Sequence, residues 1–223
     1  MGNRVKFAPG EWYHCYSRGV DKRTVFQDEA DYKRFVSLLY LANSSQHIRR
    51  DSLSKDSSVY ETTRPQVLVS IGAYALMPNH FHLLLYEKEE GGISAFMRKL
   101  GIAYAMYFNI KNKRVGNLFV KPFRSKHLAD DRYLQYCVDY IHLNPAELYE
   151  PTWKQGAVSN IVKLKSDLMQ YPHSSLFDFH VERGRPESVI LDSEACSVFE
   201  KKPLEVVLDD AQSYYEENLK MLS

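Results

Sequence analysis

Two histidines stand one residue apart in the stretch MPNHFHLLLYE, residues 77–87 of this 223-residue chain. If the stretch is a β-strand, His80 and His82 project from the same face, because side chains alternate along a strand. Neutral imidazole is the commonest side-chain metal ligand, so two imidazoles side by side could hold one cation. The other interpretation is a hydrogen-bonded pair beneath a helix, and for an isolated pair of this kind the structural interpretation is favoured.

A tyrosine and an asparagine form a second candidate pair. In YCVDYIHLNP, Tyr140 and Asn144 are four residues apart, which puts them on one helix face about one turn apart. Tyr136 also lies four residues before Tyr140. Taken alone, the pattern is therefore more typical of an aromatic stripe packed on a sheet.

The strands that would carry the histidines are predicted from aromatic and β-branched residues. Residues 11–18 and 67–76 predict two strands, and HFHLLLYEK predicts a third, joined to the second by a tight turn at MPN. Residues 117–120 and 122–129 predict shorter extended pieces. The residues that alternate with the histidines point into the core: Phe81, Leu83 and Leu85.

Three helices are predicted from apolar residues at helical spacing. The first covers residues 28–42 with Asp28 as its N-cap, and the second covers residues 91–113. The third follows Asp130, its predicted cap, and ends at Pro145, which cannot continue a helix. The order of elements predicts an α+β fold, a ferredoxin-like (RRM-like) antiparallel sheet with helices on one face.

The remaining segments have weaker patterns. Residues 43–65 are rich in Ser, Asp and Arg without a period, which predicts a flexible loop or insertion. Beyond residue 150 the periodicity weakens, and residues 203–222 predict a terminal amphipathic helix. Residues 179–223 form an acidic tail that could either be solvated or fold over a basic groove and compete with its ligand.

The net charge of +1 hides a segregation of the two signs. Residues 1–129 carry 20 Lys and Arg against 11 Asp and Glu, whereas residues 130–223 carry 9 against 17. Residues 98–126 hold eight basic residues and no acidic one. Such a region favours a polyanionic partner. A solvated helix face with a loop is an equally ordinary account of the charge alone.

Composition and cysteines limit the class of protein. Hydrophobic residues make up 44% and charged residues 26%, which is ordinary for a globular protein. We find no stretch of roughly 20 apolar residues that could span a bilayer, and the start lacks the apolar segment of a signal peptide. Cys15, Cys137 and Cys196 form neither a CxxC pair nor an even framework, which predicts a cytoplasmic setting without a membrane partner.

The two candidate motifs together resemble a known family. MPNHFHLLL, followed about fifty residues later by YLQYCVDYIHLNP, resembles the single-tyrosine HUH transposases, most closely the bacterial REP-associated tyrosine transposases. YHCYSRGVDKRTVF, GNLFVKPFRSKHLADDRYL and YPHSSL resemble further stretches, so that the likeness spans roughly residues 10–178. The sequence departs from the family's usual residues at Val120, Pro122 and His173 and has a longer 43–65 segment. These departures affect particular DNA contacts.

The resemblance implies a fold of the HUH-endonuclease type and a function. Residues 1–150 would be the catalytic domain, residues 151–178 a family-like extension and residues 179–223 the acidic tail. The protein would be a transposase that cuts and rejoins single-stranded hairpin DNA at a REP element, with no nucleotide cofactor. His80, His82 and Asn144 would bind a divalent cation, Mg²⁺ or Mn²⁺, for which Zn²⁺ or Ni²⁺ could substitute in purified material.

Tyr140 would be the nucleophile, giving a 5′-phosphotyrosine and a free 3′-OH. The base that accepts the phenol's proton stays open: Asp139 is adjacent but turned about 100° away on the helix, and water is an equal candidate. Ten basic residues are candidates for contact with the DNA backbone. These are Arg18, Lys22, Arg23, Arg98, Lys99, Lys113, Arg114, Lys121, Arg124 and Lys126.

Two other functions compete with an active transposase. One is a nucleic-acid-binding protein that keeps the fold and has lost the reaction. The other is a zinc-stabilised fold without catalysis, which would need four closed ligands. The sequence also leaves open whether the protein is a monomer or a homodimer that shares the tyrosine helix.

Overall fold

The computed structural model describes residues 6–48, 58–155, 158–181 and 184–222, with side chains described up to residue 213. Much of the predicted flexible segment 43–65, namely residues 49–57, lies outside the described residues. Its flanks include one turn of 3-10 helix at Val59–Glu61. Other single 3-10 segments lie at Val20–Lys22, Trp153–Gln155, Pro186–Ile190 and Ala195–Val198.

Four strands form one antiparallel sheet with the order β2-β3-β1-β4. They are β1 (Trp12–Arg18), β2 (Val69–Met77), β3 (His80–Glu87) and β4 (Arg124–Leu128). β2 and β3 form the predicted hairpin, and β1 lies between β3 and β4. The three long predicted strands are therefore confirmed within two residues at each end.

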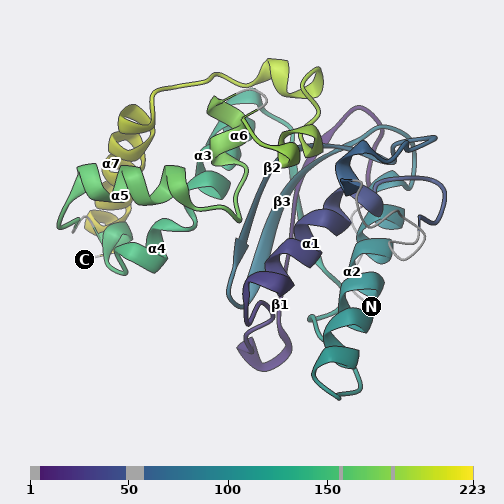
Figure 1. Ribbon diagram of the computed structural model, residues 1–223. Coiled ribbons are helices and arrows are strands. Elements are labelled where there is room, and N and C mark those ends of the chain that lie inside the picture. The colour runs from purple at the N-terminus through teal and green to yellow at the C-terminus, as the bar shows by residue number, and fades with distance from the viewer. Residues whose placement is uncertain (1–5, 49–57, 156–157, 182–183, 223) are drawn as a thin grey trace.

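Two helices cover one face of the sheet (Figure 1). They are α1 (Glu29–Leu41) and α2 (Gly92–Lys111). The side chain of Asp28 accepts a hydrogen bond from the amide of Asp31, so the predicted N-cap is confirmed. Phe35 of α1 and Tyr104 of α2 are fully buried against the strands. The resulting order β1-α1-β2-β3-α2-β4 is that of a ferredoxin-like fold.

A third helix, α3 (Asp131–Leu143), lies on the opposite face of the sheet. The prediction of helices on one face therefore holds for α1 and α2 and is incomplete for α3. Asp130 caps α3 by accepting from the amides of Arg132 and Tyr133. The helix packs its apolar stripe on small or aliphatic residues of the strands: Leu134, Val138 and Ile141 against Ala73, Ala75 and Leu84.

The α-helices of the C-terminal part lie on the same side as α3 (Figure 1). They are α4 (Ala146–Tyr149), α5 (Ile161–Gln170), α6 (Leu176–His180) and α7 (Leu204–Leu222). Residues 186–190 reach the other side, where Ile190 joins the large apolar core. Buried Trp153 joins the end of α3 to α5 and α7 in a small apolar core. The predicted helix 203–222 is confirmed as α7, while the division of the chain at residues 150 and 178 stays a prediction. No helix in the described ranges is long and apolar enough to cross a membrane.

Candidate active site

Strand alternation places polar side chains of β1 and β3 on the face of the sheet that carries α3. Tyr16 is paired with His82 and Arg18 with His80, so all four side chains project to this face. His14 lies two residues before Tyr16 and projects the same way. The same pleat sends Phe81 and Leu83 to the opposite, apolar face.

The two histidines of β3 are held by different partners. Their ring centroids are 5.0 Å apart. The Nδ1 of His80 donates to the Oδ1 of Asn79 at 2.6 Å, which leaves the Nε2 of His80 as an acceptor. The Nδ1 of His82 lies 2.8 Å from the Nε2 of His14 and shares one hydrogen with it. A neighbour thus holds the Nδ1 atom of each ring, and the Nε2 atoms are the candidates for binding a metal ion.

Burial keeps these imidazoles neutral. Burial, with a smaller contribution from the charge of Arg18, lowers the pKa of His80 to about 4. Burial and the neighbouring His14 lower the pKa of His82 to about 2. The pKa of His14 is lowered to about 4 by burial and by Lys126. At neutral pH each ring therefore keeps a lone pair that could bind a cation.

The tyrosine helix brings Tyr140 against this histidine cluster. The Tyr140 ring centroid lies 5.5 Å from that of His82 and 5.9 Å from that of His14, edge-on in both cases. Tyr140 is 38% exposed, so its side chain is accessible to a substrate. Asn144, one turn later, donates from its amide nitrogen to the carbonyl of Tyr140 at 2.8 Å. This bond uses the nitrogen of the amide and leaves its oxygen as the potential ligand atom.

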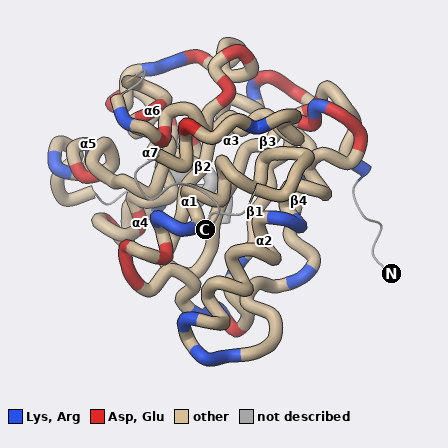
Figure 2. The backbone as a smooth tube through the Cα atoms, turned by 45° about the vertical axis from the view of Figure 1, so that its right-hand side comes forward, with Lys and Arg blue, Asp and Glu red and all other residues tan. Residues whose placement is uncertain are grey.

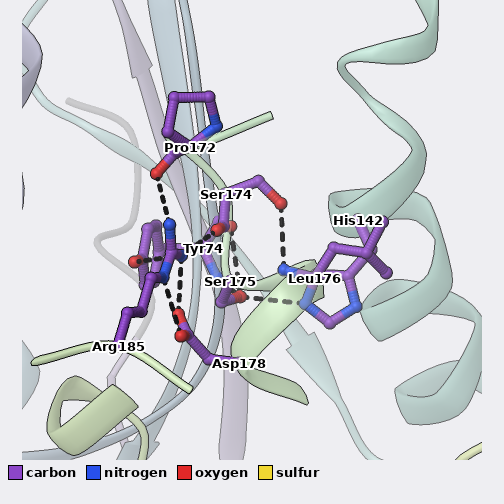
Figure 3. A network of polar contacts seen from close by, with 8 residues as sticks. All are labelled: Tyr74, His142, Pro172, Ser174, Ser175, Leu176, Asp178 and Arg185. Atoms are coloured by element: carbon purple, nitrogen blue, oxygen red, sulfur yellow. Dashed lines mark hydrogen bonds and ion pairs between the residues drawn. The ribbon is translucent and has the colours of Figure 1, made fainter. Parts of the chain in front are cut away.

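A buried polar contact anchors the same helix to the sheet (Figure 3). The Nε2 of His142 is 2.8 Å from the hydroxyl of Ser175. That hydroxyl also accepts from the amide of Tyr74 on β2 at 2.8 Å. Because His142 is two residues from both Tyr140 and Asn144, the contact restrains the position of both along α3.

The segment that carries Ser175 covers the edge of the sheet. The amide of Leu76 donates to the carbonyl of His173, and the amide of Ser175 donates to that of Tyr74. Arg185 holds the segment from outside, donating to Asp178 and to the carbonyls of Pro172 and Ser174 (Figure 3). The YPHSSL motif therefore supplies an extra pairing partner for the free edge of β2.

His173, one of the departures from the family pattern, has a packing role. Its ring stacks on Tyr32 of α1 with centroids 3.8 Å apart, and its Nε2 lies 3.1 Å from a carboxylate oxygen of Glu29. A flat ring at this position therefore packs the segment on α1 and lies away from the candidate site.

An open cleft of about 1120 Å³ surrounds the histidines and Tyr140. One side is formed by β1 and β4, the other by α3, Trp153 and the start of α7. It is lined by five basic and three acidic side chains: Arg18, Arg124, Lys126, Arg132 and Lys154, and Asp139, Glu147 and Asp210.

Only three of the ten predicted DNA-contacting residues line this cleft, namely Arg18, Arg124 and Lys126. Basic residues are spread over the whole molecule in Figure 2. Lys99 donates to the carbonyls of Ser44 and Gln46 and so has a structural role. Seven of the predicted residues lie outside the cleft lining: Lys22, Arg23, Arg98, Lys99, Lys113, Arg114 and Lys121.

Asp139, the candidate base, is half-buried beside the cleft. Its carboxylate accepts from the Nε2 of Gln135 at 3.2 Å. Burial raises the pKa of Asp139 to about 6. A carboxyl with this pKa could exchange a proton near neutral pH.

Several cleft residues were not predicted from the sequence. His14 had a usable signal, because it shares a strand face with Tyr16 and Arg18. Lys154 had none: it lies in a segment of weak periodicity, yet its Nζ is 5.6 Å from the Tyr140 ring centroid and pairs with Glu147. Arg132 and Tyr133 at the start of α3 also line the cleft.

The donor set fits a divalent cation with open coordination positions. Among the described residues, no group of three or more His, Cys, Asp or Glu side chains is arranged to hold a metal. A closed zinc site of four such ligands therefore has no counterpart in that part of the chain. Two neutral imidazoles and an amide oxygen are the available donors, and they suit a hard or borderline ion.

The structure is similar to the solved structure of a REP-associated tyrosine transposase bound to a REP hairpin. The TM-score is 0.52 at 17% sequence identity, over 91% of this chain and 99% of that chain. No protein-family model matches the chain, and no curated protein matches its sequence. The likeness confirms the α+β fold with a four-stranded antiparallel sheet, as the resemblance of the motifs implied.

Proposed function

We propose that this chain is a metal-dependent single-stranded DNA endonuclease and strand transferase of the REP-associated tyrosine transposase kind. The observation that carries the proposal is the convergence of Tyr140 from α3 with His80 and His82 from β3, at 5.5 Å between the Tyr140 and His82 rings. The shared fold with a transposase solved on hairpin DNA supports a DNA hairpin as the substrate and a location at the nucleoid.

His80 and His82 through their Nε2 atoms, and Asn144 through its amide oxygen, would hold Mg²⁺ or Mn²⁺. When bound, the ion supplies positive charge that stabilises the developing charge on the scissile phosphate. His82 would donate its Nδ1 hydrogen to His14 and His80 its own to Asn79, so that both rings present the correct nitrogen.

In the proposed reaction one bond to phosphorus forms and another breaks. The hydroxyl oxygen of Tyr140 attacks phosphorus and loses its proton, while the bond from phosphorus to the 3′ oxygen breaks and that oxygen leaves as a 3′-OH. The product is a 5′-phosphotyrosine, in which Tyr140 is bound to the 5′ end of the fragment on the 3′ side of the cut. Attack by a 3′-OH of another strand reverses the step and joins the strands, so no nucleotide is consumed.

Basic residues on the strand side of the cleft would position the DNA backbone. Arg18 lies beside His80 through the β1–β3 pairing, and Arg124 lies beside Tyr16 through the β1–β4 pairing. Lys126 follows on the same face of β4. Contacts from these side chains to phosphates would supply affinity that falls with salt and would not select a sequence.

The competing function is a binding protein of the same fold that no longer cuts DNA. Occupation of the catalytic positions by His80, His82, Tyr140 and Asn144 favours the active enzyme. The side chain of Tyr140 is also 38% exposed and therefore open to a phosphate, as an attacking group must be.

A labelled-hairpin assay tests the proposal. Hairpin DNA labelled at its 5′ or 3′ end is incubated with Mn²⁺ and with wild-type protein or Tyr140→Phe. We expect a denaturation-resistant adduct that carries the 3′ part of the DNA and is lost in Tyr140→Phe and on chelation. Tyr136→Phe, four residues earlier on the same helix, should form the adduct normally. Binding without any adduct, over a set of hairpins and metals, would instead support the binding protein.

A further inference from the structure

Three tyrosines of α3 form an exposed row along the cleft. Tyr133, Tyr136 and Tyr140 lie at helical spacings of three and four, so they share one face of the helix. They are 62%, 47% and 38% exposed, and all three line the cleft. The opposite side of α3 carries the buried stripe that packs on the sheet. The tyrosine row is therefore not part of the apolar contacts by which α3 packs on the sheet.

Each ring of the row has a cation close to it. Lys126 Nζ is 5.5 Å from the Tyr133 ring centroid, and the guanidinium carbon of Arg132 is 5.9 Å from that of Tyr136. Lys154 has the matching position beside Tyr140. Arg132 is on α3 itself, whereas Lys126 of β4 and Lys154 of the segment after α4 are brought to the row by the tertiary fold.

A row of rings with a cation beside each ring matches the chemistry of a nucleic acid strand. Bases offer flat π-faces that stack on aromatic side chains, and phosphates pair with basic groups. A helix rises about 1.5 Å per residue, which spaces the rings by about 4.5 and 6 Å along its axis, or one to two nucleotide steps of about 3.4 Å. Basic side chains outnumber acidic ones in the same cleft, five to three.

We propose that Tyr133 and Tyr136 form a stacking platform for unpaired bases that flank the scissile phosphate. The inference rests on the proposed function and deepens it, because it assigns the strand leading away from Tyr140 a path along α3 toward Lys126 on β4. A base in a duplex has both faces covered and cannot use this surface. The platform therefore recognises the unpaired state of the DNA next to the cut and tolerates any base.

The platform is tested by binding to two DNA probes. One is a blunt hairpin, and the other is the same hairpin with a single-stranded tail of about eight nucleotides that contains 2-aminopurine, a length within the range of single-strand sites. All variants are built on Tyr140→Phe and measured in chelator, so that no cleavage occurs. The variants are the double changes Tyr133→Ala with Tyr136→Ala and Tyr133→Phe with Tyr136→Phe. The control is Tyr149→Ala, a tyrosine that is 39% exposed and lies outside the cleft lining.

We expect the double alanine variant to bind the tailed hairpin at least tenfold more weakly and to lose the fluorescence quenching of 2-aminopurine. Binding of the blunt hairpin should stay within twofold of the parent. The double phenylalanine variant and Tyr149→Ala should behave as the parent, because phenylalanine keeps the ring. Thermal unfolding of each variant checks that the helix is intact.

The platform is refuted if the double alanine variant binds the tailed hairpin normally, or if it weakens both hairpins equally. It is also refuted if double phenylalanine fails as alanine does, since a hydroxyl contact would then be responsible. The proposed function is read separately, from adduct formation with Tyr140 restored and Mn²⁺ added. Normal adduct with normal tailed binding in the alanine variant would reject the platform alone.

Discussion

The two faces of the sheet are built from the same strands and differ in almost every other respect. On the α1 and α2 side, Phe81, Leu83 and Leu85 of β3 are at most 3% exposed and belong to the large apolar core. On the α3 side, His80 and His82 of the same strand line an open cleft. The helix α3 covers this second face only in part, since its exposed side borders the cleft.

The difference shows how the fold separates stability from chemistry. A residue and its neighbour in β3 project in opposite directions, so one can be constrained by packing while the other faces a substrate. The apolar face stabilises the sheet, and the polar face is then free to hold buried imidazoles whose neighbours orient them. Substitutions at adjacent positions should therefore have separable effects.

The largest effect is expected for His82→Ala. Loss of one imidazole should lower the rate of adduct formation in Mn²⁺ by about 100-fold or more, because stabilisation of charge at the phosphate is lost. The free energy of unfolding should fall by about 1–3 kcal/mol, because His82 is 5% exposed and its loss leaves the buried Nε2 of His14 unpaired. Single-turnover cleavage and urea unfolding measure the two quantities. His127→Ala, an exposed histidine on β4, should leave both unchanged, and an equal loss of rate there would contradict a specific role for His82.

The next effect falls on the other face, at the adjacent residue. Leu83→Ala should lower the free energy of unfolding by about 2–5 kcal/mol, because it leaves a cavity among fully buried residues. The fraction that remains folded should still form the adduct at a near-normal rate. A substitution that left stability intact but removed activity would show that the two faces are not independent.

Acid should lower the free energy of unfolding, because the α3 side of the sheet buries histidines in their neutral form. Burial lowers the pKa of His142 to about 3, against about 6.5 in an unfolded chain. Above pH 6.5 the ring is neutral in both states and its effect on stability is constant. As the pH falls from 6.5 toward 3, the unfolded chain binds a proton that the folded chain does not, so stability is lost in this window.

For His142 alone the expected loss at pH 5 is on the order of 2 kcal/mol, and the lowered pKa values of His14 and His82 act in the same direction. Urea unfolding of metal-free protein at pH 7 and pH 5 measures the loss. His142→Gln keeps a side chain that can reach Ser175 and removes the titration, so its stability should fall less between the two pH values. An identical fall in wild type and variant would contradict the assignment.

The smallest effect concerns the acidic wall of the cleft. Asp210 of α7 lines the cleft and pairs with Lys202 at 3.2 Å, whereas its neighbour Asp209 is exposed outside the lining. Asp210→Asn should raise affinity for hairpin DNA a few-fold at low salt, because one repulsive charge is removed from the path of the phosphates. Asp209→Asn is the matched control and should change affinity less. Equal effects would mean that only net charge matters, and no effect would favour an acidic segment that does not compete with DNA.

Local features of the site were predictable from the sequence. The alternation in HFHLLL determines that His80 and His82 share a face, and a spacing of four determines that Tyr140 and Asn144 share a helix face. The caps Asp28 and Asp130 were also predictable, because a cap bonds to amides two or three residues away. Each of these depends on neighbours along the chain, and short-range geometry is encoded by short-range sequence.

Contacts between distant segments were decided by the tertiary structure. His14 meets His82 across 68 residues, and His142 meets Ser175 across 33. Of ten basic residues that looked equivalent in the sequence, three reach the cleft. Strand register and helix docking depend on how the whole apolar core packs, and no local pattern records which side chains that packing brings together. The sequence alone therefore determined the candidate chemical groups, and the packing of α3 on the sheet decided which of them share one site.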